Sequence, residues 1–464
     1  MFKLLVVFLS LCLGSLHAES KKPDVVFIIV DDLNDWVGVM GGHPQTITPN
    51  FDALADRGML FTNAHCNAPQ CKPSRGSLLS GLYPKSTGVF VNGKVIFHGG
   101  KPLPKVKVRK KSIPLNKHFM ASGYRVALGG KVYHAGKPAA DAYLPLQKIK
   151  KPTNAPKFSA FDPPWDGFPM DTADETTGDY KVVEWAKKQW AEKSAKPLFM
   201  AVGLYRPHRP LWAPQKYFDK FPTKSIQLPA APIEDDWNDM PEYAIKIARS
   251  HAHKPFHSNG KFSDHEAILN KGGETEWKRV VGSYLANVYF MDTMLGRLLK
   301  DLESNPRDRE TIIVMTSDHG WNLGEKKHWC KGALWKNTTN VPMVIIAPGI
   351  SEAKTSSKQP VSLIDVYPTL CDLANIEKPA HLEGKSMVNL VKQTKTRKAA
   401  FLSYGPENTA MQTERYRYIL YADGSEELYD HYKDPHEWTN LASNPEYASM
   451  KAEMKKSVEE FLRK

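Results

Sequence analysis

The sequence contains few cysteines, five in 464 residues: Cys12, Cys66, Cys71, Cys330 and Cys371. Only four of them follow the first 18 residues, which is too few for a disulfide framework in a chain of this length. Nothing in the spacing indicates whether Cys66, Cys330 and Cys371 pair with one another, so that question stays open. The usual state of such a residue is a small, buried and unreactive thiol.

Long apolar runs are missing after the first 20 residues, so we expect no stable membrane insertion. The start of the chain differs, because Lys3 is followed by an apolar run to Leu16 and then by His17-Ala18 and polar residues. This order predicts a signal peptide over residues 1–18, cleaved after Ala18, and therefore a secreted or periplasmic protein. A lipoprotein signal would use Cys12, but the residue before it is large where such sites want a small one.

The composition is not extreme in any direction. Hydrophobic residues make up 41% and charged residues 24%, which excludes collagen-like, coiled-coil and wholly disordered chains. Lysine and arginine number 63 against 50 acids, and the formal charge falls from +13 to +12 when the signal peptide is removed with its one lysine. A basic surplus favours anionic partners. No nucleic-acid recognition motif is present and export argues against one, so we expect no nucleic acid.

Six short apolar, β-branched runs are each followed by a polar or glycine-rich turn, which is typical of strands buried on both faces of a sheet. Segments with helical periodicity lie between them. This alternation predicts an α/β fold over residues 24–376, with a large mostly parallel central sheet flanked by helices. The predicted strands are Val25–Val30, Met59–Phe61, Tyr124–Leu128, Leu198–Leu204, Thr311–Thr316 and Met343–Ile346, and the predicted helices are Phe51–Arg57, Ser112–Ser122, Thr177–Lys193 and Trp277–Leu302.

The pattern changes over residues 377–464, for which we predict a small C-terminal α+β subdomain. Ala399–Tyr404, Arg415–Tyr421 and Glu427–Tyr429 have the composition of strands joined by turns. The helical pattern of Glu446–Leu462 then closes the chain.

Acidic residues follow two of the predicted strands. Asp31 and Asp32 end the first strand, and Asp318 and His319 follow the fifth. Paired carboxylates resist ionising together unless a cation binds between them. An Asp-Asp pair alone is more often a helix cap or loop. With Asp318 and His319, however, it forms the oxygen-rich ligand set that a hard divalent cation prefers.

Cys71-Lys72-Pro73-Ser74-Arg75, followed by Leu79-Ser80-Gly81, resembles the signature of the formylglycine-dependent sulfatases. Further sequence motifs follow in the order typical of the family, and the resemblance extends from about residue 24 to residue 441. Within the family the chain looks most like iduronate-2-sulfatase and its bacterial relatives. The further motifs are Gly130–His134, Arg206–Pro210, Ser317–Trp321, Glu427–Asp430 and Asp434–Leu441.

The resemblance implies an alkaline-phosphatase-like sandwich and two modifications of the bare chain. A formylglycine-generating maturation enzyme would convert Cys71 to 3-oxoalanine (formylglycine). Calcium would bind Asp31, Asp32, Asp318 and His319 together with residue 71. A plain hydroxyl nucleophile would leave a stable sulfated enzyme, whereas a hydrated aldehyde can expel sulfate by collapsing to a carbonyl.

The resemblance also assigns roles to the remaining site residues. Arg75 would hold residue 71 in place, and Lys131 and Lys331 would bind the sulfate oxygens where charge builds up in the transition state. His134 would accept the proton from the second hydroxyl, and His208 would protonate the leaving alcohol. Sulfate esters hydrolyse so slowly that such groups must lower the barrier by roughly 20 kcal/mol or more.

The expected activity is therefore hydrolysis of a sulfate ester, on a sulfated, uronic-acid-containing polysaccharide or oligosaccharide. The basic segments Lys101–Lys111 and Lys148–Lys151 also suit a polyanionic substrate, although charge runs usually only solubilise loops. Two alternatives stay open. One is a phosphomonoester, phosphodiester or phosphonate-ester hydrolase of the same superfamily, and the other is a non-catalytic binder of anionic polysaccharide if Cys71 is unmodified.

Four further histidines are spaced loosely in a polar segment, and we expect loop residues there rather than a second metal site. They are His251, His253, His257 and His265.

Overall fold

The computed structural model describes residues 21–92, 96–97, 101–102, 112–147, 167–230, 236–249 and 263–463. The predicted signal peptide, the segment Lys148–Lys151 and most of Lys101–Lys111 lie outside these residues. Within them, no helix combines the length and the apolar character needed to cross a membrane. Their four cysteines, Cys66, Cys71, Cys330 and Cys371, are free and buried.

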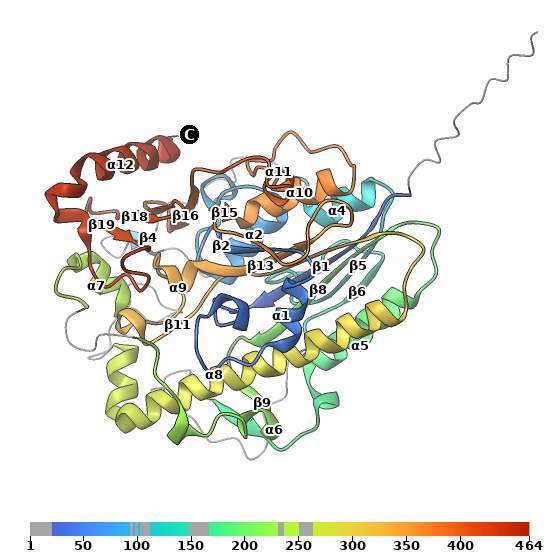
Figure 1. Cartoon of the computed structure of the whole chain (residues 1–464), viewed down its shortest axis with the longest axis horizontal. Helices are drawn as coiled ribbons and strands as arrows, with labels where there is room; N and C mark the ends of the chain where they lie inside the picture. The colour runs from blue at the N-terminus through green and yellow to red at the C-terminus, as the bar shows by residue number, and fades with distance from the viewer. Residues whose placement is uncertain are drawn as a thin grey trace, which may run out of the picture.

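A nine-stranded sheet forms the centre of the part that the structure describes (Figure 1). Its strands lie in the order β14-β2-β13-β10-β1-β8-β5-β6, and β15 pairs with β2. All neighbours are parallel except at β13, which runs antiparallel to both β10 and β2. The strands are β1 (Asp24–Asp31), β2 (Met59–His65), β5 (Arg125–Gly130), β6 (Ala142–Leu144), β8 (Leu198–Pro207), β10 (Thr311–Ser317), β13 (Asn340–Ile346), β14 (Thr355–Ser357) and β15 (Val361–Ser362).

Helices cover both faces of this sheet, which explains why its strands are continuously apolar. Val26 and Ile28 of β1 belong to the core formed with α1, α5 and α8, and Val25 and Phe27 belong to the core formed with α2, α4 and α10. Figure 1 shows α4 and α10 on one side of the sheet and α5 and α8 on the other. The helices are α1 (Pro49–Ala55), α2 (Cys71–Ser80), α4 (Leu115–Ala121), α5 (Gly178–Ala191), α8 (Asp264–Ser304) and α10 (Val366–Leu373).

Helix α8 begins 13 residues before the predicted start at Trp277. Ser263 caps it by accepting a hydrogen bond from the backbone N–H of Glu266, and the helix is interrupted at Gly272 and Gly273, whose backbone angles are not helical. The expectation that His265 lies in a loop is therefore wrong, because this residue is in the first segment of α8 and is buried. The other three histidines of that group lie outside the described residues.

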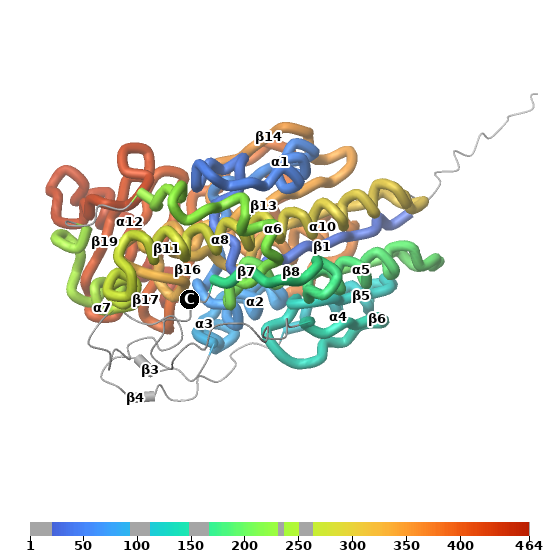
Figure 2. The backbone as a smooth tube through the Cα atoms, turned by 90° about the horizontal axis from the view of Figure 1, so that it is seen from below, coloured from blue at the N-terminus to red at the C-terminus, as the bar shows by residue number. Residues whose placement is uncertain are grey.

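The C-terminal residues form a four-stranded antiparallel sheet and a closing helix. Strand β17 was not predicted, because Asn408-Thr409-Ala410-Met411-Gln412 lacks an apolar, β-branched run. Figures 1 and 2 both place this sheet at one end of the molecule, near α7. The predicted domain boundary at residue 376 stays a prediction. The elements are β16 (Ala400–Tyr404), β17 (Asn408–Gln412), β18 (Tyr416–Leu420), β19 (Glu426–Asp430) and α12 (Ala448–Arg463).

Short elements complete the described structure. The paired strands are β3 (Ile96–Phe97) with β4 (Lys101–Pro102), β7 (Phe168–Met170) with β9 (Trp212–Pro214), and β11 (Asn322–Leu323) with β12 (Trp329–Cys330). The short helices are α3 (Pro84–Thr87), α6 (Gln215–Phe218), α7 (Glu242–Ala248), α9 (Lys336–Thr339) and α11 (Val388–Val391).

Candidate active site

Three buried carboxylates meet where β1 and β10 end side by side. Asp31 is the last residue of β1, Asp32 follows it with a left-handed φ of 62°, and Asp318 follows β10. The backbone N–H of Asp32 donates to Asp318 Oδ1 at 3.1 Å. Because β1 and β10 are parallel neighbours, their carboxyl ends lie at the same edge of the sheet, which is where ligands bind in such folds.

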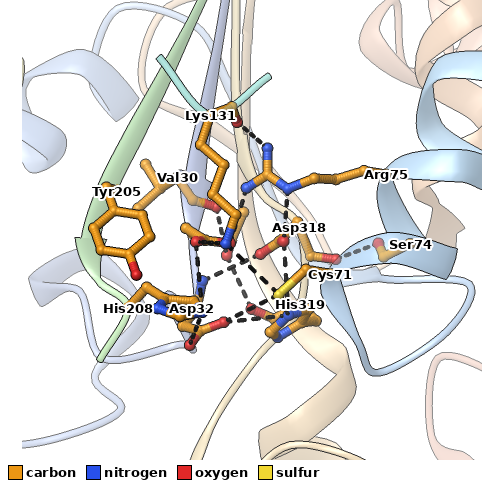
Figure 3. A network of polar contacts seen from close by, with 12 residues as sticks. Val30, Asp32, Cys71, Ser74, Arg75, Lys131, Tyr205, His208, Asp318 and His319 are labelled. Carbon is orange, nitrogen blue, oxygen red and sulfur yellow. Dashed lines mark hydrogen bonds and ion pairs between the residues drawn. The ribbon is translucent and has the colours of Figure 1, made fainter. Parts of the chain in front are cut away.

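Helix α2 brings Cys71 and Arg75 to these carboxylates from its first two turns (Figure 3). Arg75 Nη2 lies 3.0 Å from Asp31 Oδ1 and its Nε lies 2.9 Å from Asp318 Oδ2. The same guanidinium donates to the backbone carbonyls of Lys131 and Val132. Arg75 therefore ties α2, β1, β10 and the end of β5 together around Cys71.

Three positively charged or polarised nitrogens surround the Cys71 sulfur. Lys331 Nζ lies 3.0 Å from Sγ, His319 Nε2 lies 3.3 Å away and Lys131 Nζ lies 3.8 Å away. Burial raises the pKa of Cys71, but the charges of Lys131, Lys331 and His319 outweigh it and hold the pKa well below its usual value. The position of residue 71 thus favours a negatively charged group.

The two lysines are held by the carboxylates. Lys331 Nζ lies 2.7 Å from Asp32 Oδ1, and Lys131 Nζ contacts Asp31 Oδ2. Burial lowers the pKa of Lys331, but the charges of Asp32 and Cys71 outweigh burial and raise the pKa above its usual value. This ammonium group therefore stays charged. Both lysines can therefore act as fixed positive charges next to residue 71.

The acids differ in their electrostatic surroundings. Burial raises the pKa of Asp31, yet Lys131, His208 and Arg75 outweigh that effect and the pKa falls below its usual value. For Asp318 burial dominates over the favourable charges of Arg75 and His319, and the pKa rises. Asp31 therefore ionises more readily than Asp318, although both belong to the same cluster.

Two of the site histidines, His319 and His208, are each oriented by a backbone carbonyl. His319 Nδ1 bonds to Gly320 O at 3.0 Å, which turns Nε2 toward Asp32 Oδ1 at 3.2 Å. His208 Nδ1 bonds to Arg209 O, and its Nε2 lies 3.8 Å from Asp32 Oδ2. A carbonyl can only accept, so in both rings Nδ1 carries the proton. Burial also lowers the pKa of His208, against the opposing effect of Asp32.

His134 lies at the rim of this cluster. It follows β5 and is exposed, and a hydrogen bond from it contributes to the lowered pKa of Cys71. The structure therefore brings the ten predicted site residues to one place: nine of them, including Cys71 and Asp32, form the cluster, and His134 lies at its edge.

The donor set fits a divalent cation. The ligand atoms of Asp31, Cys71, Asp318 and His319 all lie within 4.8 Å of one another. Asp32 Oδ2 is buried without a hydrogen-bond partner, which is costly for a carboxylate oxygen unless a cation uses it. Three carboxylates suit a hard ion such as calcium, and His319 offers Nε2 because its Nδ1 is already bonded.

Several residues that support the site were not singled out from the sequence. Asp179, near the start of α5, accepts the backbone N–H groups of Tyr205 and Arg206 and so fixes the end of β8 just before His208. Tyr284 of α8 donates to Asp32 O at 2.8 Å. Neither carries a sequence signal, because an acid in a first helical turn and a tyrosine on a buried helix face have ordinary structural explanations.

Comparison with known proteins gives consistent matches along the chain. Residues 23–376 match the family model described as Sulfatase, and residues 324–464 match the one described as N-sulphoglucosamine sulphohydrolase, C-terminal. A sulfatase of Formosa agariphila is 34% identical over 476 residues, covering 96% of this chain and 89% of that protein. A Delta 4,5-hexuronate-2-O-sulfatase of Bacteroides thetaiotaomicron is 26% identical over 474 residues, covering 98% and 91%.

The solved structures agree on the fold. The phosphonate monoester hydrolase of Agrobacterium radiobacter superposes with a TM-score of 0.75 at 23% identity, covering 95% of each chain. This likeness confirms the predicted fold class.

Proposed function

Because the chain belongs to the sulfatase family and is a sulfuric ester hydrolase, we propose that it desulfates a uronic-acid-containing saccharide with a formylglycine derived from Cys71 and a bound calcium ion. The observation that carries this proposal is the position of Cys71. Its buried sulfur lies within 4 Å of Lys331, His319 and Lys131 and beside three carboxylates.

Two groups beyond the encoded side chains supply part of the chemistry. Asp31, Asp32, Asp318 and His319 would hold calcium next to residue 71, where it supplies positive charge for the sulfate oxygens and acidifies the nucleophile. At residue 71, a hydrated aldehyde would supply two hydroxyl groups, one as the nucleophile toward sulfur and one whose loss of a proton would favour release of sulfate.

The chain's own residues bind and orient the ester. Lys331 and Lys131 are fixed cations next to residue 71, so each can hold a sulfate oxygen while charge builds up. Arg75 holds Asp31 and Asp318 and with them the start of α2. Removing either lysine should therefore cost transition-state binding more than folding.

His208 is the candidate general acid. Its Nδ1 already carries a proton, so donation from Nε2 to the leaving alcohol requires the imidazolium form. Burial lowers the pKa of His208, but an anionic sulfate bound beside the ring would raise it. His134, at the exposed edge, can accept the proton of the second hydroxyl.

The substrate class rests on the relatives and on charge. The Bacteroides relative acts, by its name, on a 2-O-sulfated hexuronate, and the mature chain would carry a formal charge of +12. We infer a 2-sulfated uronic acid in a glycosaminoglycan or an algal polysaccharide. Export after cleavage at Ala18, and conversion of Cys71 by a maturation enzyme, complete the proposal.

The runner-up activity is hydrolysis of a phosphate or phosphonate ester by the same side chains. Parallel kinetics of wild type on an aryl sulfate and on the matching aryl phosphate and phosphonate separate the two. We expect kcat/KM to be at least 100-fold higher for the sulfate, a difference of about 2.7 kcal/mol in barrier. A preference for phosphorus would replace the proposal with the runner-up.

Intact-mass measurement of the peptide that contains residue 71 tests the modification directly. Cys71→Ala should abolish turnover with little loss of stability, and Cys371→Ala is the matched control, because Cys371 is a buried thiol of α10 outside the site. An unconverted Cys71 would leave a binder of anionic saccharides instead, whereas a Cys71→Ala variant within tenfold of wild-type activity would contradict the covalent role of Cys71.

A further inference from the structure

Arg209 is a buried arginine that has no ion-pair partner in the part of the chain that the structure describes. It is 9% exposed, and its Nη1 is buried without a hydrogen-bond partner. Among the residues that the structure describes, no carboxylate or carbonyl contacts its guanidinium. Isolated buried charges are expensive, so this one needs an explanation.

The other buried arginines show how unusual this is. Within the described ranges four arginines are buried, and three of them have clear partners. Arg75 contacts Asp31 and Asp318, Arg417 contacts Glu437, and Arg206 donates to the carbonyls of His208 and Pro210. Arg206 lies near the end of β8 and Arg209 just after it, on either side of His208, so this part of the chain does not prevent an arginine from finding partners.

The backbone of Arg209 is fixed beside the candidate general acid. Its carbonyl oxygen accepts the Tyr205 hydroxyl at 3.0 Å and the His208 ring N–H. Burial raises the pKa of the Cys330 thiol well above its usual value, and the nearby positive charge of Arg209 opposes part of that rise. Cys330 directly precedes Lys331. The side chain of Arg209 therefore extends from the loop of His208 toward the strand before Lys331.

The chemistry of the group indicates what it binds. A guanidinium presents a planar fork of donors that matches a carboxylate or a sulfate with two parallel hydrogen bonds. The scissile sulfate already has Lys131, Lys331 and the cation site. A further cation between the loops of His208 and Lys331 is thus available to a second anionic group near the ester.

We propose that Arg209 binds a second anionic group of the substrate, a carboxylate or a second sulfate, adjacent to the sulfate that is removed. This inference rests on the proposed function for the identity of the substrate, but not for its test. It makes Arg209 a specificity-determining residue, so that the enzyme discriminates doubly charged from singly charged saccharides.

The test measures binding without turnover, in the Cys71→Ala background, by calorimetry. Three probes are compared: a disaccharide with a 2-O-sulfated uronic acid, the same disaccharide with the carboxyl group reduced to an alcohol, and the reduced disaccharide with a second sulfate on the neighbouring sugar. Arg209→Met removes the charge at similar volume and Arg209→Lys keeps the charge without the fork. Arg309→Met removes the same charge at the opposite end of β10, where Arg309 contacts only the carbonyls of Lys22 and Ala195.

We expect the parent to bind the carboxylate probe ten- to 100-fold more tightly than the reduced probe, as a charged hydrogen-bonded pair warrants. Arg209→Met should abolish that preference, Arg209→Lys should keep part of it, and Arg309→Met should keep all of it. A different result is that the parent binds the probe with the second sulfate more tightly than the reduced probe, and that Arg209→Met removes that difference. In that case the anionic group that Arg209 binds is a sulfate, and the proposal is supported in that form.

If Arg209→Met weakens the binding of all three probes equally, or changes the binding of none, the proposal is overturned. Melting temperature gives a second criterion. Removing an unpaired buried charge should leave the protein as stable or more stable, so a clear drop in melting temperature for Arg209→Met identifies a structural arginine and also overturns it. Failure of wild type to hydrolyse any sulfate ester would contradict the proposed function alone, since the binding comparison does not depend on turnover.

Discussion

Replacing Glu427 by Gln should stabilise the protein above pH 7, whereas replacing its neighbour Glu426 should destabilise it. Glu427 of β19 is fully buried and accepts a hydrogen bond from Trp335 Nε1 at 2.9 Å. Its other oxygen is buried and has no hydrogen-bond partner among the described residues. Burial outweighs the nearby charge of Lys326 and raises the pKa of Glu427 to about 7 from an ordinary 4.5.

Glu426 faces the opposite side of β19 and meets helix α12. Lys451 Nζ and Lys455 Nζ lie 2.8 and 3.0 Å from its oxygens, and the Tyr418 hydroxyl donates at 2.7 Å. Burial raises the pKa of Glu426, but these partners outweigh it and lower the pKa to about 2. Two adjacent side chains therefore shift in opposite directions because successive residues of a strand face opposite sides.

The signs follow from linkage. A carboxyl group with a raised pKa favours folding below its unfolded pKa and loses that contribution as pH rises through the folded value. The destabilising effect of ionised Glu427 therefore builds up between pH 4.5 and about 7 and is present in full above that range. The shift corresponds to about 3 kcal/mol at 1.36 kcal/mol per pKa unit. Glu426 contributes above pH 4.5 and loses its contribution as pH falls toward 2; its exposed lysine partners reduce this to about 1 kcal/mol.

Urea unfolding at pH 4.5, 7 and 9 measures both effects. The gain in unfolding free energy for Glu427→Gln should grow from near zero at pH 4.5 to about 3 kcal/mol at pH 9, while Glu426→Gln should show a constant loss from pH 7 to 9. A pH-independent difference for Glu427→Gln, or a wild type that is the more stable of the two at pH 9, would refute the reasoning.

Two further predictions concern the site and its substrate. Chelation should lower both turnover and melting temperature, because a cation that binds only the folded chain at 100 times its Kd stabilises it by about 2.7 kcal/mol; unchanged rate and melting temperature would mean that Asp31, Asp32, Asp318 and His319 hold no metal. The value of kcat/KM on a sulfated oligosaccharide should fall severalfold from low salt to about 0.15 M, where charges are screened beyond about 8 Å, and an aryl sulfate should lose much less. Equal sensitivity of the two substrates would show that the basic segments do not meet the saccharide.

The parts of the site that the sequence could predict are those that follow strands. Asp31 and Asp318 stand directly after buried apolar runs, and parallel neighbours bring such residues together without any further information. Cys71 and Arg75 are one helical turn apart, so their common face also follows from the sequence. The antiparallel direction of β13 could not be predicted, because a strand buried on both faces has the same composition in either direction.

The roles of residues that depend on having a particular partner, or on having none, could not be predicted from the sequence. Asp179 matters because Tyr205 and Arg206 present their N–H groups to it, and those contacts cross from α5 to β8. Arg209 matters because nothing described contacts its guanidinium, and its sequence context is the same as that of the well-bonded Arg206. A motif gives the residue types, whereas only the packed chain shows which charges are satisfied.

The C-terminal sheet also helps to position the site, because it contacts the segment that carries Lys331. Before that lysine, Lys326 contacts Asp236 at 2.9 Å and the carbonyl of Glu437. After it, Trp335 donates to Glu427, and Arg417 of β18 donates to Leu334 O and to Thr339 Oγ1. The segment 326–339 is thus held on both sides of Lys331 by residues of the C-terminal region. A boundary at residue 376 separates two patterns in the sequence, but the lysine that reaches Cys71 is positioned by both.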